Sequence, residues 1–188
     1  MEYIRLGRSG LKVSRIAYGS WRTTAGDDGE KNSLLCHKIA FENGVNFFDT
    51  ADVYNQGQAE IVVGKFISQN KRSDLVIATK CCGSMGNQPN DKGLSRKHII
   101  EACHQSLKRL NTDYIDLYQA HSEDNDTPVE ETVAAYQLLQ KQGKILYWGV
   151  SNWGVEAMTI AKEVCLKNNG DFMISNQPKY NMFNRQVE

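Results

Sequence analysis

The sequence of 188 residues predicts an α/β fold of the (β/α)8 TIM-barrel type, incomplete and preceded by a β-hairpin. Short apolar runs alternate with longer amphipathic runs, which is typical of parallel strands joined by crossover helices. The apolar runs begin about every 30 residues, a regularity that favours a barrel over a doubly wound sheet. The sequence has neither GxGxxG after the first run nor GxxxxGK[ST] anywhere, so the usual support for a Rossmann or phosphate-loop fold is absent.

Six segments have the composition of strands that are buried on both faces. They are short, apolar and rich in β-branched or aromatic residues. We expect them to lie side by side as parallel strands. The segments are 16–19, 45–49, 75–80, 114–119, 145–151 and 172–176.

The segments between these strands predict helices with recognisable ends. Ser95 is expected to cap one helix, and Gly143 to end the next in a left-handed conformation. Thr127-Pro128-Val129-Glu130 is interpreted as a capping box with proline at the first helical position. The first helix is defined by Leu35, Ile39 and the stop at Asn43-Gly44.

Ahead of the repeating units, 3–5 and 12–14 flank a glycine-rich turn and predict a β-hairpin that could cover one end of a barrel. A closed barrel needs eight units and typically ~250 residues. The chain accounts for about six of the eight units. We therefore expect 1–188 to form one domain that lacks the C-terminal βα units.

The composition argues against several classes of protein. Lys plus Arg and Asp plus Glu both number 22, and no basic block indicates binding to nucleic acid or to a membrane surface. No apolar run approaches the ~20 residues of a membrane span, so we expect no membrane insertion. Five cysteines without a CxxC pair indicate reduced thiols in a cytoplasmic protein. His98, Cys103 and His104 have helical spacing, and a core cysteine beside exposed polar residues explains them better than zinc.

Polar residues follow five successive predicted strands at the point where each strand ends. Each residue alone could be structural, because a strand-end Asp often caps a turn and a strand-end Lys is often only solvated. The carboxyl ends of barrel strands share one rim, where active sites lie, so the coincidence favours a functional site. These residues are Asp49, Lys80, His121, Ser151-Asn152 and Asn176-Gln177.

Tyr54 lies in the loop that follows Asp49 and adds a group with a specific chemical use. A free phenol titrates near ~10, too high for an efficient acid at neutral pH, and a neighbouring ammonium such as that of Lys80 favours the phenolate form. Asp49 could pair with Lys80, and His121 could hold a substrate oxygen through a ring nitrogen. The four residues together predict a site suited to reducing a carbonyl.

Several motifs, in this order along the chain, resemble those of the aldo-keto reductases. The resemblance covers essentially the whole chain. Within that family the chain is most similar to the branch that contains potassium-channel β-subunits, through Gly19-Ser20-Trp21 and Tyr147-Trp148-Gly149. The family motifs are Phe48-Asp49-Thr50-Ala51-Asp52-Val53-Tyr54, Gly57-Gln58-Ala59-Glu60, Ala78-Thr79-Lys80, Gln119-Ala120-His121, Gly149-Val150-Ser151-Asn152 and Asn176-Gln177-Pro178-Lys179-Tyr180-Asn181.

The resemblance implies NADPH-dependent reduction of an aldehyde or ketone, with the cofactor extended across the barrel rim. It implies that Tyr54 is the general acid, that Lys80 tunes it with support from Asp49, and that His121 orients the carbonyl. The later units of the family, which supply the stacking aromatic residue and the pyrophosphate loop, have no counterpart here. The implied contacts to NADP(H) are Ser20, Trp21, Asp49, Ser151, Asn152 and Gln177.

Two further hypotheses stay open. The chain could be a non-catalytic regulatory or interaction subunit with a channel-like partner, as the branch resemblance suggests. It could also be an inactive fragment whose open sheet edges promote self-association. If the chain is instead a carbonyl reductase, as the resemblance implies, its partner is a small-molecule carbonyl substrate.

Overall fold

Parallel strands form one sheet in which neighbours in space are also neighbours along the chain. The structure, a computed structural model, describes residues 1–24, 26 and 28–188. The order β3-β4-β5-β6-β7 confirms the sequential arrangement of a barrel wall. The strands are β3 (Tyr18–Gly19), β4 (Phe47–Asp49), β5 (Val76–Cys81), β6 (Ile115–Ala120) and β7 (Ile145–Val150).

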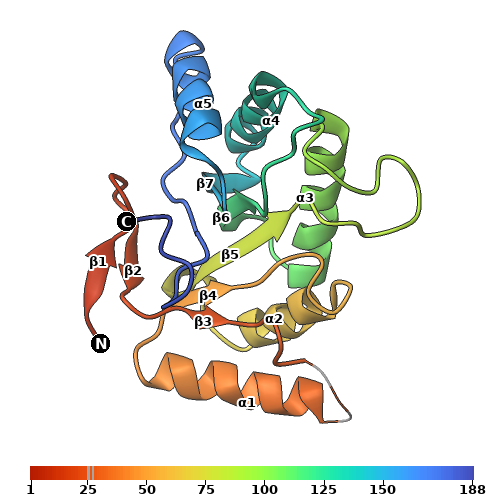
Figure 1. Cartoon of the computed structure of the whole chain (residues 1–188). Coiled ribbons are helices and arrows are strands. Elements are labelled where there is room, and N and C mark those ends of the chain that lie inside the picture. Colours follow the sequence, from red (N-terminus) through yellow and green to blue (C-terminus); the bar gives the residue numbers. More distant parts are fainter. Residues whose placement is uncertain (25, 27) are drawn as a thin grey trace.

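Helices follow the strands and lie in an arc around the outside of the curved sheet (Figure 1). Each α-helix contacts the next one along the chain, as expected for successive βα units. The α/β class and the incomplete (β/α)8 architecture predicted from the alternation are therefore confirmed. The helices are α1 (Gly29–Glu42), α2 (Gln58–Ser68), α3 (Arg96–Leu110), α4 (Val129–Lys141) and α5 (Val155–Lys167), with the short 3-10 helix η1 (Arg72–Asp74) before β5.

The sixth predicted strand, 172–176, is reduced to a parallel bridge between Val150 and Asn176. The segment still follows the edge of β7, because the Ile174 N–H donates to the Trp148 carbonyl at 3.0 Å and the Gln177 N–H to the Val150 carbonyl at 2.9 Å. It therefore extends the polar rim beyond β7.

The predicted hairpin is present as β1 (Tyr3–Arg5) paired antiparallel with β2 (Lys12–Ser14). Its base is held at the amino end of β4, where the Ser14 N–H donates to Oδ1 of Asn46 at 2.6 Å. Its turn packs on the 172–176 segment so closely that a Cβ on Gly7 would lie 2.2 Å from the Ile174 carbonyl oxygen. The hairpin thus lies at the end of the sheet opposite to Asp49.

Three of the predicted helix ends are confirmed and one is wrong. α1 ends with Asn43 as its C-cap, and Gly44 follows with φ +86°. Oγ of Ser95 accepts the His98 N–H at 3.2 Å, and Gly143 ends α4 with φ +68°. The predicted capping box at Thr127 does not form, because the Thr127 hydroxyl donates to Oδ2 of Asp124 at 2.7 Å. A carboxylate in the preceding loop therefore takes the hydroxyl that the pattern assigned to the helix.

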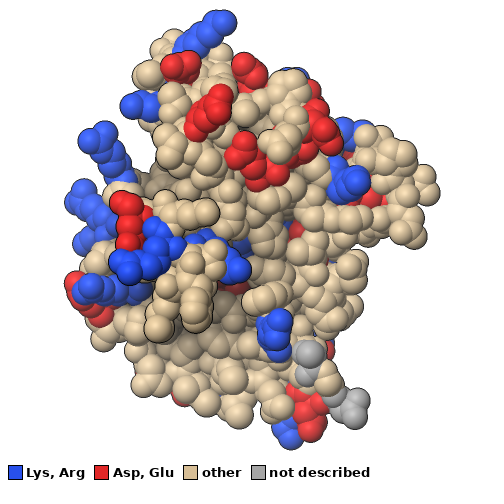
Figure 2. All heavy atoms as spheres, viewed as in Figure 1, with Lys and Arg blue, Asp and Glu red and all other residues tan. Residues whose placement is uncertain are grey.

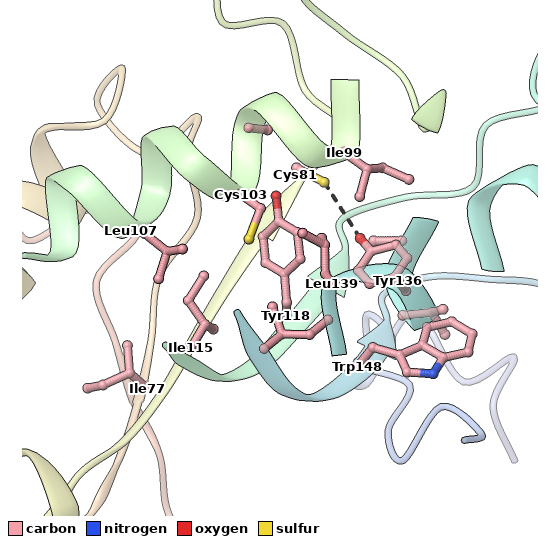
Figure 3. Close-up of a cluster of buried hydrophobic side chains, with 14 of the residues drawn as sticks. Ile77, Cys81, Ile99, Cys103, Leu107, Ile115, Tyr118, Tyr136, Leu139 and Trp148 are labelled. Atoms are coloured by element: carbon pink, nitrogen blue, oxygen red, sulfur yellow. Dashed lines mark hydrogen bonds between the residues drawn. The ribbon is translucent and has the colours of Figure 1, made fainter. Parts of the chain in front are cut away.

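The core lies between the sheet and the helices and is rich in aromatic rings (Figure 3). Tyr136 of α4 stacks on Trp148 of β7 with centroids 5.3 Å apart, and its hydroxyl lies 3.5 Å from Sγ of Cys81. Burial raises the pKa of the Cys81 and Cys103 thiols, the latter to about 12, so both stay protonated core groups.

The surface of α1 departs from the expected amphipathic pattern. Leu35 and Ile39 are 54% and 49% exposed, whereas Ser33 and His37 of the same helix are buried. On the face shown in Figure 2, Lys and Arg gather over the hairpin side, and Asp and Glu over α4 and α5. Among the described residues, no helix combines the length and hydropathy that crossing a membrane requires.

Candidate active site

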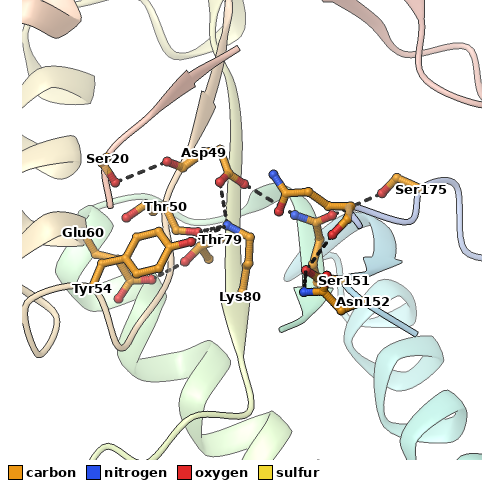
Figure 4. A network of polar contacts seen from close by, with 12 residues as sticks. Ser20, Asp49, Thr50, Tyr54, Glu60, Thr79, Lys80, Ser151, Asn152 and Ser175 are labelled. Carbon is orange, nitrogen blue, oxygen red and sulfur yellow. Dashed lines mark hydrogen bonds and ion pairs between the residues drawn. The ribbon is translucent and has the colours of Figure 1, made fainter. Parts of the chain in front are cut away.

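The strand register brings the predicted site residues to one end of the sheet. Asp49 is the last residue of β4, and Lys80 pairs with Gln119 across β5 and β6. Beyond β4 the loop continues the pairing, since the Asp52 N–H donates to the Lys80 carbonyl at 3.1 Å. This contact holds the start of the loop against β5 and turns Tyr54 toward Lys80 (Figure 4).

Lys80 is the centre of the site. Its Nζ donates to Oδ2 of Asp49 at 2.6 Å, to the Thr50 carbonyl at 2.8 Å and to the Tyr54 hydroxyl at 3.3 Å. The side chain is 1% exposed. An ammonium has three hydrogens, so these three acceptors satisfy it completely. The geometry that Asp49, Tyr54 and Lys80 were predicted to share is therefore present.

His121 follows β6 and is held by its backbone N–H, which donates to the Cys81 carbonyl at 2.8 Å. Its ring lies edge-on to the Tyr54 ring, with centroids 5.5 Å apart and an interplanar angle of 76°. Burial, and then the charge of Lys80, lowers the pKa of His121 to about 4. The imidazole is therefore neutral at pH 7, with one nitrogen able to donate a hydrogen bond and the other able to accept one.

The Tyr54 hydroxyl, the buried Lys80 ammonium and the neutral His121 imidazole therefore lie next to one another. The half-buried Tyr54 hydroxyl accepts a hydrogen bond from the Lys80 ammonium at 3.3 Å, and a cation at that position would stabilise a phenolate if the hydroxyl gave up its proton. A neutral His121 can donate a hydrogen bond to an oxygen that gains negative charge. The chemistry available to the group is protonation of a polarised carbonyl oxygen.

Five of the six residues predicted to contact a cofactor fall into two groups. Ser20 is buried beside Asp49, and its hydroxyl donates to the Asp49 carbonyl at 3.2 Å. Across the rim, the Ser151 hydroxyl donates to the Gln177 carbonyl at 2.8 Å, and the Asn152 side-chain amide donates to Oγ of Ser151 at 3.0 Å. This second group presents hydroxyl and amide groups, which are the complement of a carboxamide.

Trp21 lies apart from both groups. Its side chain is 63% exposed, and the Arg22 guanidinium lies 4.6 Å from the centre of its ring. It follows Ser20 directly, so it stands at the outer margin of the rim and makes no contact with Lys80 or Tyr54 among the described interactions.

Gln119 bridges Asp49 and Ser175, which lies two residues before Gln177, and it was not assigned a role from the sequence. Its Nε2 donates to Oδ1 of Asp49 at 3.5 Å, and its Oε1 accepts the Ser175 hydroxyl at 3.3 Å. Gly149 makes room for this contact, because a Cβ there would lie 2.3 Å from Oγ of Ser175. The sequence could have indicated this role, because Gln119 lies two residues before His121 on a predicted strand. In the structure it pairs with Lys80 of the neighbouring strand.

A further polar group behind Tyr54 was also missed. Glu60 of α2 is fully buried and accepts the Thr79 hydroxyl at 2.6 Å and Nε of Arg109 at 2.6 Å. Asp52, in the Tyr54 loop, is also fully buried. Both carboxyls lie within the motifs quoted above, but a sequence pattern does not indicate that they are inaccessible to water.

Residues 15–188 match the model of the aldo/keto reductase family. The chain is 43% identical over 187 residues to a probable voltage-gated potassium channel subunit beta of Oryza sativa subsp. japonica, covering 98% of this chain and 57% of the relative. The Arabidopsis thaliana protein of the same description gives the same values. A putative voltage-gated potassium channel subunit beta of Schizosaccharomyces pombe is 43% identical over 185 residues, covering 96% and 54%. The chain thus spans little more than half the length of these curated relatives.

Proposed function

Because the chain belongs to the aldo/keto reductase family, we propose that it carries the catalytic site of an NADPH-dependent oxidoreductase that converts aldehydes or ketones to alcohols. The observation that carries the proposal is the contact of one buried ammonium with two functional groups. Nζ of Lys80 lies 2.6 Å from Asp49 and 3.3 Å from the Tyr54 hydroxyl. A lysine held only for stability needs the first contact but not the second.

In this proposal each of the four residues has one task. Tyr54 gives its proton to the carbonyl oxygen of the substrate, which becomes the hydroxyl of the alcohol. Lys80 stabilises the phenolate left behind, and Asp49 keeps the ammonium in place. His121, neutral at pH 7, orients the carbonyl by donating a hydrogen bond to its oxygen.

The bound cofactor would supply the hydride, and the rim of this chain would hold it. The hydroxyl and amide groups of Ser151, Asn152 and Gln177 suit the nicotinamide carboxamide. Ser20 and Asp49 would border the opposite side of the ring, and the exposed Trp21 would lie at the margin. We propose that 1–188 act as one domain in the cytoplasm, where the five free thiols would stay reduced.

Two measurements test this function in the chain as it exists. Titration with NADPH, followed by tryptophan fluorescence, should show binding at micromolar levels, and Trp21→Phe should reduce the signal if Trp21 is the reporter. Aldehyde-dependent oxidation of NADPH should fall about 10²–10⁴-fold in Tyr54→Phe. Absence of binding at millimolar NADPH, or undiminished turnover in Tyr54→Phe, contradicts the proposal.

A second candidate function is a non-catalytic subunit, favoured by the similarity to proteins described as channel β-subunits. In that case the chain would bind a membrane channel and show no turnover. Co-purification with such a channel, together with unchanged association in Tyr54→Phe, supports this candidate. Steady turnover by a monomer without any bound partner counts against it.

A further inference from the structure

Asp52 is a buried carboxyl in the loop that carries Tyr54. The residue is 0% exposed. Its Oδ1 accepts the backbone N–H of Val53 at 2.7 Å, whereas Oδ2 has no hydrogen-bond partner within the part of the chain that the structure describes. An ionised carboxylate in such a position loses its hydration without a compensating partner, which disfavours the charged form.

The cations close to Asp52 are already paired with other carboxylates. Nε of Arg109 lies 2.6 Å from Oε2 of Glu60, and the second oxygen of Glu60 accepts the Thr79 hydroxyl at 2.6 Å. Nζ of Lys80 lies 2.6 Å from Oδ2 of Asp49. Neither cation is therefore committed to Asp52.

The charges around Asp52 also indicate that one carboxyl is protonated. Asp49, Asp52 and Glu60 are three carboxyls, and Lys80 and Arg109 are two cations. This interior is electrically neutral only if one carboxyl keeps a proton. Asp52 is the carboxyl whose oxygen has no donor, so a proton on that oxygen removes the uncompensated charge.

We propose that Asp52 is a positioning residue that holds a proton behind Tyr54 and thereby keeps the Lys80 ammonium directed to Asp49 and the Tyr54 hydroxyl. The loop supports this coupling, because the Asp52 N–H donates to the Lys80 carbonyl at 3.1 Å and Tyr54 lies two residues further on. The inference rests on the proposed function for the role of Tyr54, but the protonation of Asp52 does not depend on turnover.

The pKa of Asp52 lies at a pH that can be reached in a titration of the folded protein. Burial, and then the charge of Glu60, raise the pKa of Asp52 from 3.8 to about 7, while the Val53 N–H, Arg109 and Lys80 act in the opposite direction. The other ionisable groups coupled to it are Cys81, Cys82 and Tyr118, whose pKa values burial also raises, so they stay neutral. Ionised Asp52 adds a second negative charge near Lys80 and weakens the pull of the ammonium on Tyr54.

Carbon-13 NMR of the side chains tests the protonation of Asp52 and its coupling to Tyr54, and it requires no substrate. The Asp52 carboxyl signal should change with an inflection near pH 7. The Cζ signal of Tyr54, identified by its loss in Tyr54→Phe, should show an inflection at the same pH. An Asp52 signal that changes near pH 4, with ordinary aspartates, overturns the proposal, and so does a Tyr54 signal that ignores the titration of Asp52.

Two variants distinguish coupling between Asp52 and Tyr54 from a merely structural role of Asp52. Asp52→Asn mimics the protonated acid, so the inflection of Tyr54 near pH 7 should vanish. Asp116→Asn is the matched control, since Asp116 is a buried carboxyl already paired with Arg72 at 2.6 Å, and the Tyr54 inflection should persist in it. A Tyr54 inflection that survives Asp52→Asn contradicts the positioning role.

Glu60→Gln keeps the proposal testable if Asp52→Asn does not fold. It removes the negative charge near Asp52 and frees Arg109, so the inflections of Asp52 and Tyr54 should both move to lower pH. Unmoved inflections, or a shift of one without the other, overturn the coupling. If turnover is absent while the Asp52 and Tyr54 signals titrate together, the proposed function is contradicted but the protonation of Asp52 is supported.

Discussion

Nζ of Lys80 lies 2.6 Å from Oδ2 of Asp49, and the two side chains are 1% and 11% exposed. The pair joins β4 and β5 at the rim and leaves one hydrogen of the ammonium for the Tyr54 hydroxyl at 3.3 Å. In a buried pair of this kind each charge depends on the other for its solvation. The proposed proton transfer and the stability of the fold therefore involve the same contact, and mutations can separate the two effects.

Lys80→Met should lower the free energy of unfolding by about 3–5 kcal/mol, because it leaves the Asp49 carboxylate buried and unpaired. Adding Asp49→Asn should restore most of the stability but no turnover. Urea denaturation measures the first effect and NADPH oxidation the second. Lys65→Met is the control, since Lys65 and Glu30 are 47% and 53% exposed, and it should cost less than about 1 kcal/mol.

Asp52→Asn should change how stability depends on pH. A carboxyl whose pKa is raised by folding binds its proton more tightly in the native state, so the contribution of Asp52 to the stability of the wild type is lost as the pH rises from about 4 to about 7. The loss is at most about 4 kcal/mol, at about 1.4 kcal/mol per pH unit. The variant should match the wild type at pH 4 and exceed it above pH 7 in urea denaturation. A difference that does not grow with pH contradicts this prediction.

His121 should remain neutral through the physiological range. Because folding lowers the pKa of His121 from 6.5 to about 4, its contribution to stability is present above about pH 6.5 and is lost as the pH falls toward 4. Ring titration by proton NMR should locate the inflection near pH 4. His121→Ala should reduce turnover about 10²–10³-fold, as loss of an oxyanion donor does, and His121→Asn, which keeps an N–H donor, should lose less.

Gly149→Ala should detach the 172–176 segment from β7. The new Cβ would lie 2.3 Å from Oγ and 3.0 Å from the carbonyl oxygen of Ser175, so we expect a loss of about 1–3 kcal/mol. Adding Ser175→Ala should recover only part of it, since the carbonyl contact remains. Gly10→Ala is the control, because nothing lies within 4 Å of that position, and it should leave the urea midpoint almost unchanged.

Much of the fold followed from local pattern. Buried strands and amphipathic helices have their own periodicities, so the elements and the class were predictable without knowing any neighbour. The meeting of Asp49 with Lys80 was also predictable, because the carboxyl ends of parallel strands share one rim. The prediction was wrong at Thr127, whose hydroxyl donates to Asp124, three residues earlier in the same loop, instead of capping α4.

The residue types, their order and the spacing of the motifs come from the chain alone, and they were sufficient for the architecture and for four candidate catalytic groups. Only the packing of β4, β5, α2 and α3 decided that Asp52 is buried with no cation of its own among the described residues, and only the register of β6 placed Gln119 between Asp49 and Ser175. The reason is physical. Periodicity is a property of successive residues, whereas desolvation and the pairing of charges depend on segments that are distant in sequence and meet in the folded chain.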